Sequence, residues 1–239
     1  MKSTEPESSE TEVAVVREKA SHRKGRTSQV VRAARVPAQE RSRKRYQAIL
    51  DATIELLKSS NVEDISLHDI GKATGLPPPS VHYLFSTMTA IHIELNAYFN
   101  DLLTQRILDF SLAQGFSEVS SWQELVRRAM SLARDELNSS RPMAEIMLGP
   151  VLHRSMRVNN LEMNRYHGKA ARELFDKFFV VPDVPNMATY LMYAAEMSDG
   201  LWIGSYARHG RVDDETFEES VRACIAYLRC YFPETMPRR

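Results

Sequence analysis

Residues 65–85 read ISLHDIGKATGLPPPSVHYLF, and the architecture of the chain follows from this segment. Ser66 and Asp69 have the spacing of a capping box, which predicts that a short helix covers residues 67–74. The glycine that follows is well placed to end this helix in a left-handed conformation. The prolines after it make a turn and open a second, very short helix over residues 78–85, since proline is tolerated in a first helical turn. Together these signals predict a helix-turn-helix unit.

Apolar residues at helical spacing continue on both sides of this unit. A helix over residues 42–59 precedes it, with one apolar stripe formed by Tyr46, Ile49, Leu50, Ile54 and Leu57. After residue 87, proline and glycine separate further segments of helical periodicity, and no segment alternates as a strand would. The sequence predicts an all-α fold of roughly nine helices. The later helices are expected over 88–112, 121–139, 142–156, 159–179, 186–209 and 214–231.

Capping residues suggest where several of these later helices begin and end. Asn159, Asn186 and Asp213 lie at the N-cap positions of predicted helices. Gly210 lies at a position where a glycine commonly ends a helix. Pro150 cannot donate a hydrogen bond to the preceding turn. We therefore expect Pro150 to kink or divide the helix predicted over 142–156.

Charge is spread unevenly along the 239 residues, although 31 basic and 31 acidic side chains cancel overall. Residues 1–40 lack periodic apolar positions and are rich in Ser, Thr, Glu and Arg, which predicts a disordered N-terminal arm. Residues 17–45 hold eleven basic side chains against Glu18 and Glu40. A basic flank on an acidic body favours a polyanion bound at one end, with a solvated tail as the alternative. The predicted organisation is an arm over 1–40, the helix-turn-helix domain over 41–87 and a helical body over 88–239.

Several classes of protein are disfavoured by what the sequence lacks. No apolar run approaches the roughly 20 residues that span a bilayer, and no signal-peptide core is present, so we expect a cytoplasmic protein. Cys224 and Cys230 cannot build a disulfide scaffold and have no nearby histidine that would make a metal site. Phosphate loops, nucleophile elbows and zinc-protease helices are absent. We expect no enzyme, no catalytic residue, no metal and no cofactor.

Three segments of the N-terminal region carry a family resemblance: YQAILDATIELL (46–57), ISLHDIGKATGL (65–76) and SVHYLF (80–85). Taken together they resemble the N-terminal domain of TetR-family transcriptional regulators over about residues 43–95. The body matches that family mainly in architecture. The resemblance implies an operator-binding homodimer with a three-helix DNA-binding domain and a larger C-terminal domain for ligand binding and dimerisation.

Candidate DNA contacts follow from this resemblance, and double-stranded DNA is the implied partner. Contacts with DNA phosphates orient a protein on the duplex without reading the base sequence. The three prolines at 77–79 replace a family pattern like Ser-Arg-Gly and remove backbone N–H groups that could bind phosphate. Recognition of bases should therefore depend on apolar contact with thymine methyl groups and on hydrogen bonds from Ser80 and Tyr83. The candidate contacts are Arg43, Lys44, Arg45, Ser66, His68, Pro78, Pro79, Ser80, His82, Tyr83 and Thr87.

Methionines and aromatic residues of the body suit either a pocket for an apolar small molecule or an ordinary core. Polar residues within apolar helices are more informative, since a buried polar group needs a partner. Glu196 is one such residue: it faces a ligand cavity, or alternatively it forms a hydrogen bond within the protein or is exposed. The candidate effector contacts are Phe99, Met147, Met163, His167, Tyr193, Glu196 and Trp202.

The last two predicted helices resemble those that form the dimer interface in the TetR family. Two glycines four residues apart permit close helix approach, and apolar residues supply a seam that packing within one subunit could also use. The candidate interface residues are Gly200, Ile203, Gly204, Ala207, Val221, Ile225 and Leu228.

These observations predict a homodimeric repressor that a small molecule releases from a pseudo-palindromic operator. One alternative keeps the DNA-binding head but places it under the control of a protein partner, with no small-molecule inducer. Another alternative is an all-α enzyme that has the fold of a binding protein.

Overall fold

Helices form the regular secondary structure of the residues that the computed structural model describes, which are 34, 39–112, 118–149 and 154–239. Nine α-helices and one 3-10 turn lie within these residues. They are α2 (Glu40–Leu57), η1 (Val62–Asp64), α3 (Leu67–Thr74), α4 (Pro78–Leu84), α5 (Met88–Leu112), α6 (Trp122–Ser139), α7 (Arg141–Met147), α8 (Arg154–Phe178), α9 (Met187–His209) and α10 (Asp214–Leu228). The prediction of an all-α fold with roughly nine helices is confirmed. The predicted arm, apart from its last few residues, lies outside the described residues.

The helix-turn-helix unit follows its local sequence signals closely. The Ser66 hydroxyl accepts a hydrogen bond from the Asp69 N–H at 3.3 Å, and the Asp69 carboxylate accepts one from the Ser66 N–H at 3.1 Å. This capping box begins α3 at the predicted residue. Gly75 ends α3 in the left-handed region, at φ 66° and ψ 13°. Pro78 and Pro79 occupy the first two positions of α4, where N–H groups have no acceptor within the helix.

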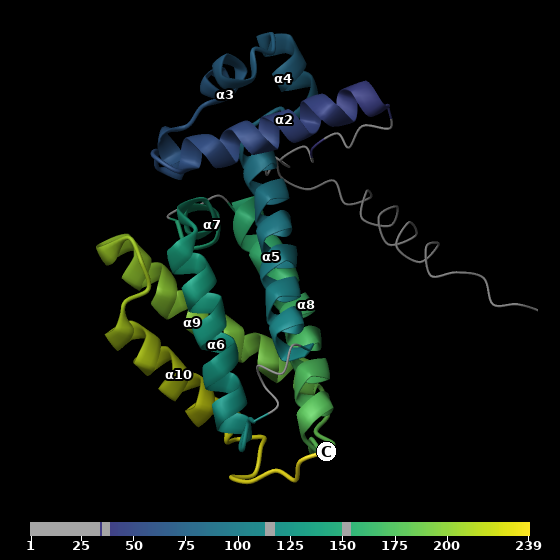
Figure 1. The fold of residues 1–239 in the computed structure, drawn as a ribbon, viewed down its shortest axis with the longest axis vertical. Coiled ribbons are helices and arrows are strands. Elements are labelled where there is room, and N and C mark those ends of the chain that lie inside the picture. The colour runs from purple at the N-terminus through teal and green to yellow at the C-terminus, as the bar shows by residue number, and fades with distance from the viewer. Residues whose placement is uncertain (1–33, 35–38, 113–117, 150–153) are drawn as a thin grey trace, which may run out of the picture. The chain divides into compact units, whose positions relative to one another are not determined.

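Helix α2 packs against α3, which in turn packs against α4, so that the three helices form one head (Figure 1). The Tyr46 ring of α2 stacks on Phe85, which follows α4 directly, with 4.7 Å between the ring centroids. The apolar stripe predicted for the first helix supplies much of this core. The fully buried side chains of the head include Ile49, Leu57, Ile70, Val81 and Phe85.

We predict that Ser66→Ala lowers the free energy of unfolding by about 1 kcal/mol, because the first turn of α3 loses its N-cap acceptor. Chemical denaturation measures the difference. Ser86→Ala, at an exposed position between α4 and α5, is the matched control and should change stability by less than about 0.5 kcal/mol. Equal losses in the two variants would contradict a capping role for Ser66.

Helices α5 to α10 form the body, in which α8 packs along α9 and α10 packs against both α9 and α6 (Figure 1). The C-terminal residues return to the end of α8, where the Arg239 N–H donates to the Phe178 carbonyl at 3.0 Å. Near the start of α6, the Trp122 indole N–H donates to the Pro233 carbonyl at 2.8 Å. These bonds fix the end of the chain against α6 and α8.

Two of the predicted helix boundaries in the body are wrong. The helix expected over 142–156 ends at Met147, and residues 154–156 belong to α8. Asn159 lies inside α8 and not at its N-cap, because α8 begins at Arg154. A residue suited to capping can also be accommodated within a helix, since capping preference is a local signal that tertiary packing overrides. Pro150 lies outside the described residues.

The other predicted capping residues lie at the expected helix ends, whereas the last helix ends at Leu228 and not at residue 231. The Asp213 carboxylate accepts a hydrogen bond from the Thr216 N–H at 2.9 Å and caps α10. Gly210 ends α9 in the left-handed region. Asn186 precedes α9 as expected, but its backbone is left-handed at φ 62° and its side chain makes no capping bond.

Helix α7 joins the head to the body through two charged side chains. Arg141 donates to the carbonyls of Leu57 and Ser60, at 2.8 and 2.9 Å, at the end of α2. Glu145 is buried, and its carboxylate accepts from the Val62 N–H at 2.9 Å and from the Tyr206 hydroxyl at 2.7 Å. One carboxylate therefore connects the 3-10 turn of the head with the C-terminal part of α9.

Helices α8 and α9 lie in close contact at Gly168. A Cβ atom at this position would lie 2.2 Å from the Ala188 carbonyl oxygen and 3.1 Å from the Met192 nitrogen. Both are backbone atoms of α9, so they cannot move aside by a change of side-chain rotamer. The absence of a side chain at Gly168 thus sets the spacing of these two helices.

Candidate functional site

Helix α4 divides into a buried face and an exposed face. Val81 and Leu84 are buried in the head, while Pro78, His82 and Tyr83 are exposed, and Tyr83 keeps 63% of its surface accessible. The Ser80 N–H donates to the Pro77 carbonyl at 2.8 Å, so this N–H is used within the chain. The outward side of α4 therefore presents proline rings, an imidazole and a phenol, which offer apolar contact and hydrogen bonds, and it carries no Lys or Arg.

The other candidate DNA contacts lie on the segments around α4. Ser66 begins α3, and His68 is exposed in its first turn. Thr87 is exposed, and its hydroxyl accepts from the Ala90 N–H at 3.2 Å, which caps the start of α5. Because Tyr46 stacks on Phe85, the start of α2 lies beside the end of α4. That start carries the basic residues Arg43, Lys44 and Arg45.

Among these basic residues, Arg43 and Lys44 are exposed and Arg45 is half-buried. The Lys44 ammonium lies 3.1 Å from the Glu40 carboxylate in a pair that is open to solvent. Such exposed pairs contribute little to stability and exchange readily with other partners. Lys44 is therefore able to contact a phosphate at low energetic cost.

A second candidate surface lies on α9. Gly200 and Ala207 are exposed, and a Cβ atom at Gly200 would meet no atom within 4 Å. Ile203, Gly204 and Ile225 are half-buried, whereas Val221 and Leu228 are buried within the subunit. The structure adds an exposed apolar stripe along the same helix, which consists of Tyr193, Met197 and Leu201.

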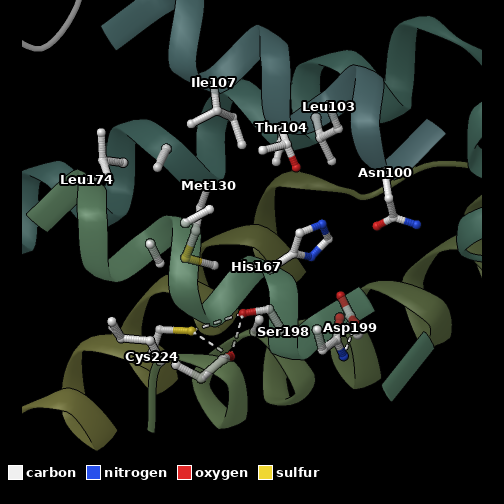
Figure 2. A pocket seen from close by; sticks show the side chains of 18 of the residues that line it. Asn100, Leu103, Thr104, Ile107, Met130, His167, Leu174, Ser198, Asp199 and Cys224 are labelled. Atoms are coloured by element: carbon white, nitrogen blue, oxygen red, sulfur yellow. Dashed lines mark hydrogen bonds between the residues drawn. The ribbon is translucent and has the colours of Figure 1, made fainter. Parts of the chain in front are cut away.

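A cavity of about 260 Å³ lies between the helices of the body (Figure 2). Helices α5 to α10 all contribute to its lining, which is largely apolar. Of the candidate effector contacts, Met147, Met163, His167 and Trp202 line the cavity. The structure puts the other three elsewhere: Phe99 is buried outside the lining, Tyr193 is exposed, and Glu196 is half-buried.

The cavity wall also contains polar side chains of α5 that are not among the candidate residues predicted from the sequence. Asn96, Asn100 and Thr104 are buried, although α5 is otherwise rich in apolar residues. Their spacing of four residues places all three on one face of α5, and this regularity was visible in the sequence. Asn164 and Asp199 add to the group from α8 and α9, and the Asn164 amide donates to the Asp199 carboxylate at 3.2 Å.

Burial changes the chemistry of two further groups in the cavity. Desolvation lowers the pKa of His167 below its usual value, even though the Asp101 carboxylate acts in the opposite direction. His167 is therefore neutral near pH 7. Burial also raises the pKa of the Cys224 thiol, which donates to the Ala194 carbonyl at 3.2 Å and lies 2.9 Å from the Ser198 hydroxyl. A protonated thiol is a poor nucleophile.

Among the described residues, no group of three or more His, Cys, Asp and Glu side chains could hold a metal ion. Within the same residues, no helix is long and apolar enough to cross a bilayer.

Neither a protein-family model nor a curated protein matches the sequence. Solved structures do match the fold. A TetR-family regulator from Streptomyces coelicolor is 15% identical at a TM-score of 0.58, and the match covers 79% of this chain and 98% of that one. A TetR regulator from Rhodococcus sp. RHA1 is 18% identical, with the same TM-score and coverage. One from Mesorhizobium loti is 13% identical at 0.53, covering 81% of this chain and 99% of that chain. The chain thus has the fold expected from the resemblance in its N-terminal segments.

Proposed function

We propose that this protein is a transcriptional regulator that binds operator DNA as a homodimer and is released from it by a small molecule. The observation that carries the proposal is the two-sided helix α4. Its inner side is buried in the head, and its outer side is exposed. A DNA major groove is about 12 Å wide and admits one helix. A short, rigidly held helix with an open outer face suits that groove.

Contacts to DNA would divide into positioning and reading. Arg43, Lys44 and Ser66 flank α4 and are suited to phosphates, which fix orientation. Pro78, Pro79 and Tyr83 of α4 are suited to base edges, where proline rings meet thymine methyl groups and the phenol forms a hydrogen bond. A basic arm over residues 1–40 would add affinity that depends on salt, since neutralised phosphates release counterions.

Dimerisation would place two heads on one face of the duplex. The exposed apolar stripe of α9, next to Gly200 and Gly204, supports an interface there, because small residues let helices approach closely and large apolar residues gain from being covered. A two-fold dimer would present its two α4 helices about 34–36 Å apart, one turn of DNA. A pseudo-palindromic operator matches that symmetry.

An effector in the cavity would act through the helices that connect it with the head. Helix α5 follows the head directly and lines the cavity through Asn100 and Thr104. Helix α7 lines the cavity through Met147 and contacts the head through Arg141. A ligand that fits one arrangement of these helices better than another shifts the population of dimers that match the operator.

A second candidate is regulation by a protein partner. It is favoured by exposed apolar side chains on α5 and α8, which are Tyr98, Phe110, Val158, Leu161 and Tyr166. A partner would cover this surface and leave the cavity unused. Binding of a small molecule in the cavity that changes DNA affinity distinguishes the first candidate from the second.

Selection from a random duplex pool tests the proposal directly. Purified protein is expected to enrich a duplex with two inverted half-sites whose centres are about one helical turn apart. Light scattering on the same sample is expected to give a dimer. Failure to enrich any sequence at low ionic strength, or a stable monomer at high concentration, would overturn the proposal.

We predict that Tyr83→Ala weakens binding to the selected duplex by about 1–3 kcal/mol, roughly 5- to 150-fold, because a base or phosphate contact is lost. Fluorescence anisotropy with labelled duplex measures the affinity. Tyr166→Ala removes another exposed tyrosine, on α8, and should leave DNA affinity unchanged. Full affinity in Tyr83→Ala would mean that α4 does not face the DNA.

A further inference from the structure

The polar side chains of the cavity gather on one side. Figure 2 shows the His167 ring between Asn100 and Asp199, with Leu174 and Met130 on the opposite side. The remainder of the lining is largely apolar and comes mostly from α6, α8 and α9. A molecule that fills this cavity would therefore bury an apolar part and keep one polar end near His167.

His167 has hydrogen-bonding capacity directed into the cavity. Among the described residues, no group forms a hydrogen bond with its ring nitrogens, whose nearest ring contact is the neighbouring Tyr166. A neutral imidazole offers one N–H donor and one nitrogen acceptor. A ligand group that engages both atoms gains hydrogen bonds that the described residues do not supply.

The charge of the lining restricts which polar end is suitable. None of the described lining residues is Lys or Arg, and Asp199 contributes a carboxylate. Among these described lining residues, a negatively charged head group would meet no opposite charge and would lie near the Asp199 carboxylate, and its desolvation would be costly. A head group that donates a hydrogen bond meets acceptors instead, at the His167 ring and at the side-chain oxygens of Asn100 and Thr104.

We propose that the effector is a small, largely apolar molecule whose single polar end donates a hydrogen bond and carries no negative charge. This inference rests on the proposed function, because it names the class of effector that controls the regulator. The cavity volume of about 260 Å³ lies just below the range of typical drug-sized sites and suits a small molecule.

Matched straight-chain probes test the head-group preference in the full-length protein. We use 1-octanol, octylamine and octanoate, which share one apolar chain and differ in the polar end. Calorimetry and thermal unfolding are expected to show binding of 1-octanol or octylamine with a Kd at least about tenfold below that of octanoate. At saturation, the bound probe is expected to raise the Tm by several degrees, because it binds only the folded state.

Variants at His167 test its role. His167→Leu keeps the bulk and removes both hydrogen-bonding atoms, so the Kd for 1-octanol should rise about tenfold. His167→Gln keeps a donor and an acceptor and should retain most of the affinity. Tyr166→Leu, at the exposed neighbouring position, is the control and should bind as the unchanged protein does.

Each result decides the proposal. Preferential binding of octanoate, absence of binding by all three probes, or unchanged 1-octanol affinity in a folded His167→Leu would overturn it. Because these measurements contain no DNA, they remain decisive even if the protein binds no operator. Conversely, preferential octanoate binding in a protein that enriches a palindromic duplex would remove the effector class and leave the proposed function intact.

Discussion

Replacing Glu145 by alanine is expected to lower the free energy of unfolding by about 3 kcal/mol, because two buried donors lose their acceptor. The Val62 N–H and the Tyr206 hydroxyl both donate to this carboxylate and come from opposite sides of the junction between head and body. Burial and the Glu145 carboxylate together raise the pKa of Tyr206, so its hydroxyl remains a donor at neutral pH. Urea denaturation of the unchanged protein and the variant measures the loss.

Two further variants test whether the loss of stability is specific to the Glu145 carboxylate. Glu145→Gln keeps the shape and one oxygen acceptor, so it should lose only about 1 kcal/mol. Glu63→Ala removes an exposed carboxylate from the nearby 3-10 turn and should change stability by less than about 0.5 kcal/mol. A loss in Glu145→Ala no larger than that in Glu63→Ala would show that the junction does not depend on this carboxylate.

Ser80→Asp is expected to weaken operator binding by about a hundredfold or more, because it places a negative charge on the face of α4 that would meet DNA. Like charges at an interface cost several kcal/mol, and about 1.4 kcal/mol corresponds to a tenfold change. The head should remain folded, because Ser80 is the third residue of α4 and acidic residues stabilise the first turn of a helix. Anisotropy at low and moderate salt measures the affinity, and the Tm reports folding.

Ser139→Asp is the control for this charge. It adds the same carboxylate at an exposed position at the end of α6, and its DNA affinity should change by less than about twofold. Similar affinity of Ser80→Asp and Ser139→Asp for the selected duplex would exclude α4 from the DNA interface.

The head was predictable because its signals are local. Ser66, Asp69 and Gly75 specify the ends of α3 within a few residues of sequence, and the observed helix has the expected bounds. The body was less predictable because Asn159 resembles a cap but lies within α8. Its helix ends depend on packing between distant segments, and single-residue preferences do not report that packing.

Helix α9 shows why the cavity could be predicted only in part. It carries a buried stripe that includes Leu191 and Trp202 and an exposed stripe that includes Tyr193 and Met197. Both stripes are apolar, so hydrophobic periodicity alone does not indicate which one faces the interior. The polar residues of α5 were a clearer signal, since Asn96 and Asn100 interrupt an apolar helix at helical spacing.

The contact at Gly168 limits how this protein can diverge. A methyl group there would act as a wedge between α8 and α9, because the carbonyl of Ala188 leaves it no room. His167 and Ala171 line the cavity from the same helix, so the wedge would also move one wall. Any descendant of this sequence that acquires a side chain at Gly168 must therefore hold α8 and α9 farther apart, and it would enclose a wider chamber that admits bulkier compounds.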